Sequence, residues 1–246
     1  MRSSDTTGAT DASVREMVRK RHRRRRATLV SLVAVFVVVG GALVGVGLVR
    51  AGDSGPGEAP SRVPAGAASD KSGLVFSDGP VRVDIYLDYL CPACRDTERS
   101  LAPVLTTLRA DRDITLVYHP VAFLDDYSDP AGYSTQAASA AACAADQGHF
   151  EQYSSVLFDL QPPERGPGLS EAQLVAAGRE AGITDDSFAT CVDDAPYLPW
   201  VTYVSDVAAS DDIALTPTVT VNGTRVDVTG SDPGAALAGA VAEAGR

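Results

Sequence analysis

Two cysteines three residues apart, Cys91 and Cys94, lie where a predicted strand meets a predicted helix. Residues 81–88 alternate apolar and polar side chains, with the period of two that is typical of a β-strand. From 101 to 108, leucine and valine recur at spacings of three and four, which indicates a helix. Pro92 suits the first helical position, where its missing N–H breaks no hydrogen bond. The cysteine pair is therefore predicted at a helix N-terminus directly after a strand.

The chain beyond this junction predicts further elements in a definite order. They are a strand, a helical block, a helix, a two-stranded hairpin and a final helix, at residues 114–118, about 125–195, 200–207, 219–228 and from 232. Asn222-Gly223, between two runs of alternating valines, is a strong hairpin signal. When the helical block is set aside, this order of elements predicts an α/β thioredoxin-like core with an inserted helical domain.

A charge-free apolar segment, residues 27–49, separates two parts of the chain with opposite charge. As a helix its 23 residues rise about 34 Å, enough to cross a bilayer core of roughly 30 Å. The first 26 residues hold nine Lys or Arg and three Asp or Glu, which leaves 12 basic and 29 acidic residues after them and a formal charge of −17. The positive-inside rule therefore places the N-terminus in the cytosol and the rest outside, and it favours a membrane helix over nucleic-acid binding for the basic run.

Four segments follow from this topology: a basic cytosolic tail (1–26), a transmembrane signal anchor (27–49), a flexible linker (50–72) and an exported domain (73–246). The linker is rich in Gly, Ala, Pro and Ser and has too few large apolar residues to form a core. A cleaved signal peptide is the alternative to the anchor. Its apolar region is normally about 7–15 residues and ends at a small-residue cleavage site, whereas this segment is longer and ends Leu48-Val49-Arg50-Ala51.

The close cysteine pair has three possible roles: zinc binding, a structural disulfide or redox chemistry. A structural zinc site usually needs two close pairs of ligands, but Cys143 and Cys191 are 48 residues apart and have no Cys or His neighbour at ligand spacing. A Cys91–Cys94 disulfide would close too short a loop to stabilise the fold appreciably.

Redox chemistry fits the predicted position of the pair. At a helix N-terminus, unpaired N–H groups and the helix dipole stabilise a thiolate, here on Cys91. Cys94, one turn further on, can then attack a mixed disulfide formed through Cys91. We therefore expect Cys91 and Cys94 to be the catalytic residues, without a metal or another cofactor.

The segments DYLCPAC (88–94) and LTPTVTVNG (215–223), together with the helical block, resemble the DsbA-like branch of the thioredoxin superfamily. The resemblance extends from about residue 73 to the C-terminus. CxxC alone is only moderately specific, whereas CPxC combined with the later Thr-Pro and Asn-Gly is strong. The resemblance implies that Thr216-Pro217 forms the cis-proline loop beside the cysteines. It also implies that Pro92, Ala93, Thr216 and Pro217 contact the substrate.

The chain departs from the DsbA-like pattern at two positions. The strongest oxidants of that group carry a histidine where this chain has Ala93, so the resemblance implies a less stabilised thiolate and a milder potential. Six residues before the first cysteine, where related proteins often carry a buried acid, the chain has Ile85, and the neighbouring Asp84 is predicted to face the other side of the strand. The sequence therefore does not identify the group that exchanges a proton with Cys94.

Cys143 and Cys191 are expected to pair with each other and to tie two helices of the inserted block together. Closing a loop of nearly fifty residues stabilises a protein by about 4 kcal/mol in the chain-entropy model. The alternative is a second redox pair that relays electrons. The even number of cysteines, four, suits the oxidising side of a membrane, where disulfides persist.

Together these features predict an exported, membrane-anchored thiol–disulfide oxidoreductase that forms disulfides in extracytoplasmic proteins. Its expected partners are exported proteins with cysteines, a membrane redox partner that recycles the active site, and the membrane itself through one helix, but no nucleic acid. Two alternatives remain open. One is a thiol reductase for cytochrome c maturation or another dedicated client, and the other is a non-catalytic binding domain of the same fold.

Overall fold

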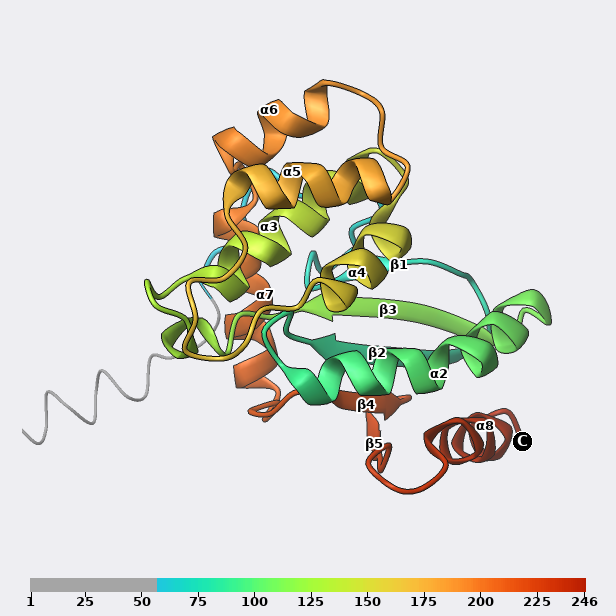
Figure 1. Ribbon diagram of the computed structural model, residues 1–246. Coiled ribbons are helices and arrows are strands. Elements are labelled where there is room, and N and C mark those ends of the chain that lie inside the picture. The colour runs from blue at the N-terminus through green and yellow to red at the C-terminus, as the bar shows by residue number, and fades with distance from the viewer. Residues whose placement is uncertain (1–56) are drawn as a thin grey trace, which may run out of the picture. The chain divides into compact units, whose positions relative to one another are not determined.

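The computed structural model describes residues 57–246 (Figure 1). The predicted cytosolic tail (1–26), the predicted span (27–49) and the first part of the predicted linker lie outside the described residues. Within 57–246, no helix combines the length and the apolar character that crossing a membrane would require.

A five-stranded mixed sheet forms the centre of the domain. Its strands, in spatial order, are β1 (Leu74–Val75), β3 (Ile114–Pro120), β2 (Val81–Leu87), β4 (Thr218–Val221) and β5 (Thr224–Val226). β2 and β3 are parallel, and the other neighbouring pairs are antiparallel. A parallel pair needs a crossover connection, which helix α2 (Pro92–Ala110) supplies. The predicted hairpin is confirmed as β4–β5, with Asn222 and Gly223 both at positive φ in the turn.

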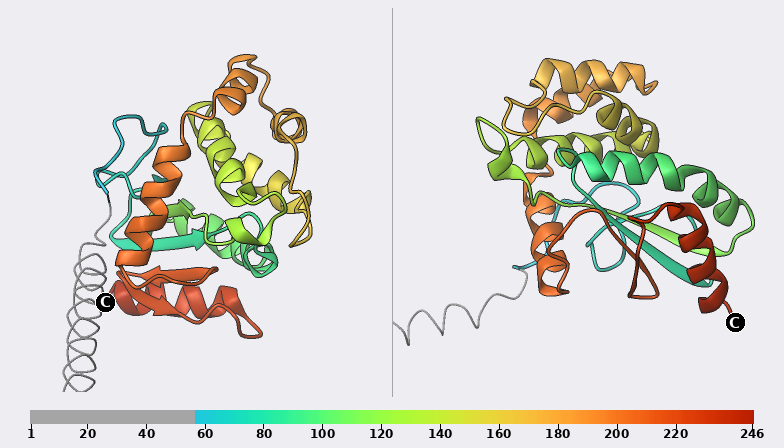
Figure 2. Two further views of the ribbon diagram at one scale, coloured as in Figure 1. Left: turned by 90° about the vertical axis from the view of Figure 1, so that its left-hand side faces the viewer. Right: turned by 60° about the horizontal axis from the view of Figure 1, so that its bottom comes forward.

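Helices cover both faces of this sheet (Figure 2). α2 packs beside the last helix, α8 (Pro233–Ala244), and their apolar side chains, including Leu101, Leu105 and Leu237, are buried. α7 (Leu198–Ser210) lies on the opposite face from α2 (Figure 2). Successive side chains of a strand point to opposite faces, so Ile85 of β2 lies toward α2 while Tyr86 lies on the other side.

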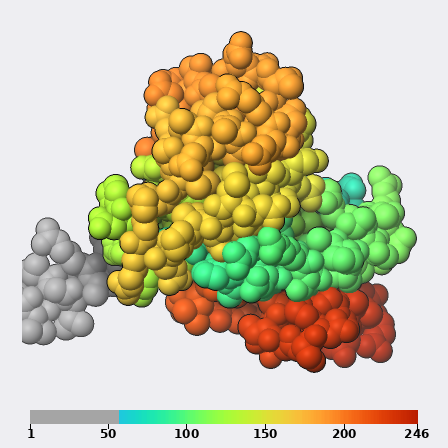
Figure 3. Space-filling view, in the orientation of Figure 1, coloured from blue at the N-terminus to red at the C-terminus, as the bar shows by residue number. Residues whose placement is uncertain are grey.

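A helical block lies between β3 and α7 in the chain and forms the upper part of the molecule in Figures 1 and 3. It contains η1 (Asp125–Tyr127), α3 (Tyr133–Asp146), α4 (Phe150–Asp159), α5 (Glu171–Glu180) and α6 (Ser187–Asp194). The alanine-rich α3 is almost fully buried and contacts α4, α5, α6 and α7, because its small side chains let several helices approach closely. The predicted capping box, Ser170 with Gln173, is confirmed at the start of α5.

The segment just before β1 differs from the flexible linker predicted over 50–72. The indole Nε1–H of Trp200 donates to the Lys71 carbonyl at 2.7 Å, and the Tyr203 hydroxyl donates to the Asp70 carbonyl at 3.1 Å. The backbone N–H of Ala65 donates to the Asp146 carboxylate at 2.8 Å. The second half of this segment therefore packs against α3 and α7. The composition of this segment does not predict its packing, because most of these hydrogen bonds use backbone groups, which every residue has.

His119 is a buried residue of β3, 2% exposed. Its Nδ1 lies 2.7 Å from the Ser72 carbonyl, its Nε2 lies 2.9 Å from the Asp84 carboxylate, and its ring stacks on Tyr86 with centroids 4.2 Å apart. Asp84 also pairs with Arg82, so the charge on the carboxylate is compensated. This cluster joins the segment before β1 to the face of the sheet that lies away from α2.

Candidate active site

Cys91 is the N-cap residue of α2, at the end of the loop that leaves β2. Its backbone is extended (φ −79°, ψ 113°), and Pro92 follows as the first helical residue. The Cys91 Sγ accepts a hydrogen bond from the backbone N–H of Cys94 at 3.4 Å. The sulfur therefore satisfies an N–H group that the helix leaves unpaired, as an N-cap side chain does. Pro92 and Ala93 are exposed beside it.

The surroundings of Cys91 favour its thiolate form. The hydrogen bond from the Cys94 thiol lowers the pKa of Cys91 most, and the Cys94 N–H lowers it further. Partial burial and the negative charge of Asp88 oppose this shift but are outweighed, so the pKa of Cys91 lies below that of an ordinary thiol. A thiolate is the nucleophilic form of cysteine, so Cys91 is the sulfur prepared to react.

Cys94 lies one turn into α2 and is only 2% exposed. Burial and the neighbouring Cys91 sulfur raise the pKa of Cys94 well above its usual range. Its Sγ lies 3.5 Å from the backbone N–H of Asp88. Both free cysteines are buried, with Cys91 6% and Cys94 2% exposed, and they differ chiefly in acidity. Cys91 is suited to attack or to be attacked from outside, and Cys94 to act on Cys91 from within.

The Thr216–Pro217 loop lies against both cysteines. Its peptide bond is cis, and the Cys91 thiol donates to the Thr216 carbonyl at 3.4 Å. Pro217 lines a small cavity together with Cys94. The loop arrives here because β4, which follows it, pairs antiparallel with β2. Leu215, just before the loop, is 70% exposed and gives the surface near Cys91 an apolar side chain.

The structure therefore brings together the residues that the sequence proposed for one site, Cys91, Cys94, Thr216 and Pro217, although more than 120 residues separate the two segments. Pro92 and Ala93 lie on the surface of the same site.

Gln161 is a site residue that the sequence did not reveal. Its side-chain amide donates to the carbonyls of Tyr89 at 2.9 Å and Cys91 at 3.0 Å. Gln161 follows α4, so the helical block holds the backbone of the loop that carries the nucleophile. No local pattern identifies it, because both of its partners are backbone carbonyls some 70 residues earlier in the chain.

Asp88 is a second residue whose role only the structure shows. It is fully buried, and its carboxylate accepts from the backbone N–H groups of Leu90 and Leu124, both at 2.9 Å, and from the Ser134 hydroxyl at 2.6 Å. Burial raises the pKa of Asp88 to about 6, although these three donors favour the ionised form. Asp88 thereby fixes the turn before Cys91 and joins it to α3.

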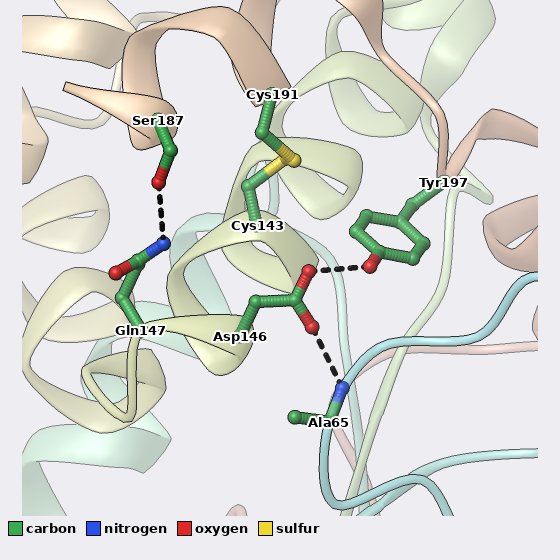
Figure 4. The surroundings of a disulfide bond; sticks show 7 residues. All are labelled: Ala65, Cys143, Asp146, Gln147, Ser187, Cys191 and Tyr197. Atoms are coloured by element: carbon green, nitrogen blue, oxygen red, sulfur yellow. Dashed lines mark hydrogen bonds between the residues drawn. A yellow bond between two sulfur atoms is a disulfide. The ribbon is translucent and has the colours of Figure 1, made fainter. Parts of the chain in front are cut away.

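The other two cysteines form a disulfide within the helical block (Figure 4). Cys143 of α3 and Cys191 of α6 have Cα atoms 5.9 Å apart. Close to the bond, Asp146 accepts from the Tyr197 hydroxyl, and Gln147 donates to Ser187 at 3.1 Å. Because these two sulfurs bond to each other, they are not available as ligands in a zinc site with Cys91 and Cys94.

Comparison with known proteins agrees with this geometry. A family model described as thioredoxin matches residues 76–236, more than half of the chain. Two solved structures from Mycobacterium tuberculosis are similar throughout the domain. The reduced disulfide bond oxidoreductase DsbG is 33% identical, with a TM-score of 0.57, and the match covers 79% of this chain and 90% of that one. Oxidised DsbA is 32% identical, with a TM-score of 0.58, and the match covers 73% and 90%.

This chain belongs to the thioredoxin family, as a DsbA-type thiol–disulfide oxidoreductase. The thioredoxin-like α/β fold expected from the sequence is confirmed. The MdbA thiol–disulfide oxidoreductase of Actinomyces oris shares the fold, with a TM-score of 0.60 at 22% identity over 74% of this chain and 89% of that one.

A curated relative contains a similar segment within a much longer protein. The serine/threonine-protein kinase PknE of Mycobacterium tuberculosis is 35% identical over 112 residues, or 43% of this chain. The matched part of the DsbA-type chain spans only a fifth of the length of that kinase. The similarity to the kinase is therefore limited to this matched segment.

Replacing Ala93 with histidine should lower the pKa of Cys91 further and make the disulfide more oxidising. Ala93 offers no hydrogen bond or charge to the Cys91 sulfur, whereas an imidazolium beside the sulfur would stabilise the thiolate. Thiolate absorbance measured against pH will show the shift, with Ala93→Gln as a neutral control of similar size. If Ala93→His and Ala93→Gln titrate like the natural protein, groups other than the residue at 93 control the acidity of Cys91.

Proposed function

We propose that the protein forms disulfide bonds in exported proteins, working outside the cell membrane and held there by the segment 27–49. Oxidised Cys91–Cys94 accepts a thiolate of the client at the Cys91 sulfur. A second client cysteine then attacks this mixed disulfide and leaves with the new disulfide, while both enzyme cysteines end as thiols. The two electrons taken from the client pass to a membrane redox partner when the pair is oxidised again.

The position of Cys91 at the N-cap of α2 carries this proposal. The N–H and thiol of Cys94 stabilise the Cys91 thiolate, and stabilising the thiolate stabilises the reduced form of the pair. A pair whose reduced form is stabilised is an oxidant. The Cys143–Cys191 disulfide supports the proposed location, because disulfides persist mainly in oxidising compartments. The basic run before residues 27–49 supports an orientation with the domain outside.

The reduction potential of the Cys91–Cys94 pair tests the direction of the reaction. We expect a value between about −120 and −180 mV, the range from DsbA to protein disulfide isomerase, and nearer the lower end because Ala93 gives no extra stabilisation. The potential is measured by equilibrating the domain with glutathione buffers and quantifying the reduced fraction by alkylation. A value near −270 mV, typical of thioredoxin, would contradict the oxidase proposal and favour a reductase with a dedicated client.

A further inference from the structure

Glu98 is a half-buried carboxylic acid one helical turn after Cys94. Residues four apart on a helix lie on the same face, so Glu98 lies on the side of α2 that carries Cys94. Its Oε2 atom is buried, and no group within residues 57–246 forms a hydrogen bond with it. A buried polar atom without a partner is costly and rare in proteins, so its presence calls for a role.

Glu98 borders a small cavity beside Cys94. Cys94, Glu98 and Pro217 line this cavity together with apolar side chains such as Ile85 and Tyr118. The space open to the centre of a water molecule is about 10 Å³, which corresponds to roughly one water. Cys94 and Glu98 are thus the titratable groups of the cavity, apart from the phenol of Tyr118, whose pKa burial raises far beyond neutral pH.

Glu98 also lines a second space. It lines an open surface groove between α2 and α4, together with Arg109 and Glu151. Arg109 is paired with Glu151 at 2.5 Å, so its charge is directed away from Glu98. Glu98 therefore borders both the cavity lined by Cys94 and a groove that is open to solvent.

The charges around Glu98 suit it to exchange protons near neutral pH. Burial raises the pKa of Glu98 to about 7, and the negative charges of Glu151 and Asp159 add to this shift. Arg99 opposes the shift but is paired with Asp159 at 2.6 Å. An acid–base group is most effective when its pKa is close to the working pH.

Asp88, the fully buried carboxylate near the cysteines, is arranged differently. All three of its hydrogen bonds come from donors outside the cavity, namely Leu90, Leu124 and Ser134. Its backbone N–H lies close to the Cys94 sulfur, whereas its carboxylate is engaged in holding the turn before the helix. A carboxylate that accepts three hydrogen bonds is poorly placed to take up a proton from Cys94.

We propose that Glu98 is the proton acceptor and donor for Cys94, and that it connects the buried sulfur with solvent through the groove between α2 and α4. When Cys94 attacks a mixed disulfide on Cys91, its thiol loses a proton to the Glu98 carboxylate. The Cys94–Cys91 bond forms, and the bond between Cys91 and the client breaks, with the client leaving as a thiolate. In the opposite direction Cys94 leaves as a thiolate and takes the proton back from Glu98. This inference rests on the two-cysteine chemistry of the proposed function but not on its direction.

Glu98→Gln tests the assignment, because the amide keeps the size of the side chain but cannot accept the proton. Reduced protein is mixed with oxidised glutathione, quenched with acid and alkylating agent, and analysed by intact mass, which separates the mixed disulfide from the closed disulfide. We expect Glu98→Gln to form the mixed disulfide at the normal rate but to resolve it more slowly, by roughly 100-fold or more, at pH 7. In the natural protein the resolution rate should rise with pH and level off above about 7, where Glu98 is ionised. In Glu98→Gln the resolution rate should continue to rise at pH values where the natural protein has reached its plateau.

Two further variants keep the test decisive. Glu151→Gln is the matched control, because Glu151 lines the groove but not the cavity. It should keep the plateau rate and shift the midpoint to slightly lower pH, since its charge raises the pKa of Glu98. Glu98→Asp keeps a carboxyl group and should retain the plateau at a reduced rate, which provides a readout even if Glu98→Gln folds poorly.

Several results would overturn the assignment. Resolution by Glu98→Gln at the natural rate, with the natural pH profile, would show that Glu98 exchanges no proton with Cys94. Equal slowing of formation and resolution would show that Glu98 acts only by supporting the fold around Cys91. A natural protein that formed no mixed disulfide at all would contradict the proposed function as well, so the two failures are distinguishable.

Discussion

Replacing Cys91 with serine will abolish thiol–disulfide exchange, whereas replacing Cys94 with serine will stop the reaction after its first step. Of the two cysteines, Cys91 is the helix N-cap residue and has the lowered pKa, so Cys94 cannot start the exchange in its place. Cys94→Ser retains this nucleophile but lacks the thiol that attacks the mixed disulfide. Reduced Cys94→Ser should therefore accumulate a disulfide with a cysteine-containing peptide, and Cys91→Ser should accumulate none.

The trapped species is measured by intact mass after acid quenching, with and without reductant. Cys94→Ala serves as a second variant, because serine keeps a hydroxyl that can still donate to the Cys91 sulfur and alanine does not. Full turnover by Cys94→Ala would contradict the two-cysteine mechanism. A mixed disulfide on Cys94 in the Cys91→Ser protein would show that the assignment of the two roles is reversed.

Replacing both Cys143 and Cys191 with alanine will lower the melting temperature substantially while leaving the chemistry of Cys91 largely intact. The bond closes a loop of 48 residues, which corresponds to about 4 kcal/mol in the chain-entropy model. For a domain of this size that free energy amounts to a shift of roughly 8–16 °C. The effect should concentrate in α6, a helix of eight residues that this bond ties to α3.

The matching control is the Cys91→Ala/Cys94→Ala protein, whose melting temperature should remain close to that of the natural protein with its active-site pair reduced. Graded reduction followed by alkylation and mass spectrometry separates the two pairs directly. Mild reductant should open Cys91–Cys94 alone, because structural bridges have low potentials. Labelling of Cys143 before Cys91 would contradict the structural role and favour a relay pair.

The elements around the cysteine pair were predictable because they depend on local physical preferences. Alternating side chains identify β2, the positions of Pro92 and the leucines identify α2, and Asn222-Gly223 identifies the hairpin. Each signal lies within a few residues of the element that it predicts. The redox role of Cys91 followed in the same way, since a helix N-terminus stabilises a thiolate whatever the rest of the fold.

The spacing of Glu98 from its neighbours in α2 is a sequence pattern that is easily overlooked. Cys94, Glu98, Leu101 and Leu105 follow each other at spacings of four, three and four, so the acid occupies the buried stripe of α2. This pattern places a carboxyl group on the core-facing side of the helix. It does not show that Ile85 and Pro217 line the same cavity, or that the Oε2 atom of Glu98 finds no hydrogen-bond partner within residues 57–246.

The strand–helix junction, the chemistry of its two cysteines and their family can be read from the amino-acid sequence alone. The distant groups around them come together only on folding: Gln161 at the Cys91 loop, Glu98 in the cavity beside Cys94, and residues 65–72 packed against α3 and α7. Most of these contacts use backbone carbonyls or apolar walls from segments far apart in the chain. Backbone groups are the same at every residue, so the amino-acid pattern does not record which of them will meet until the sheet and helices have packed.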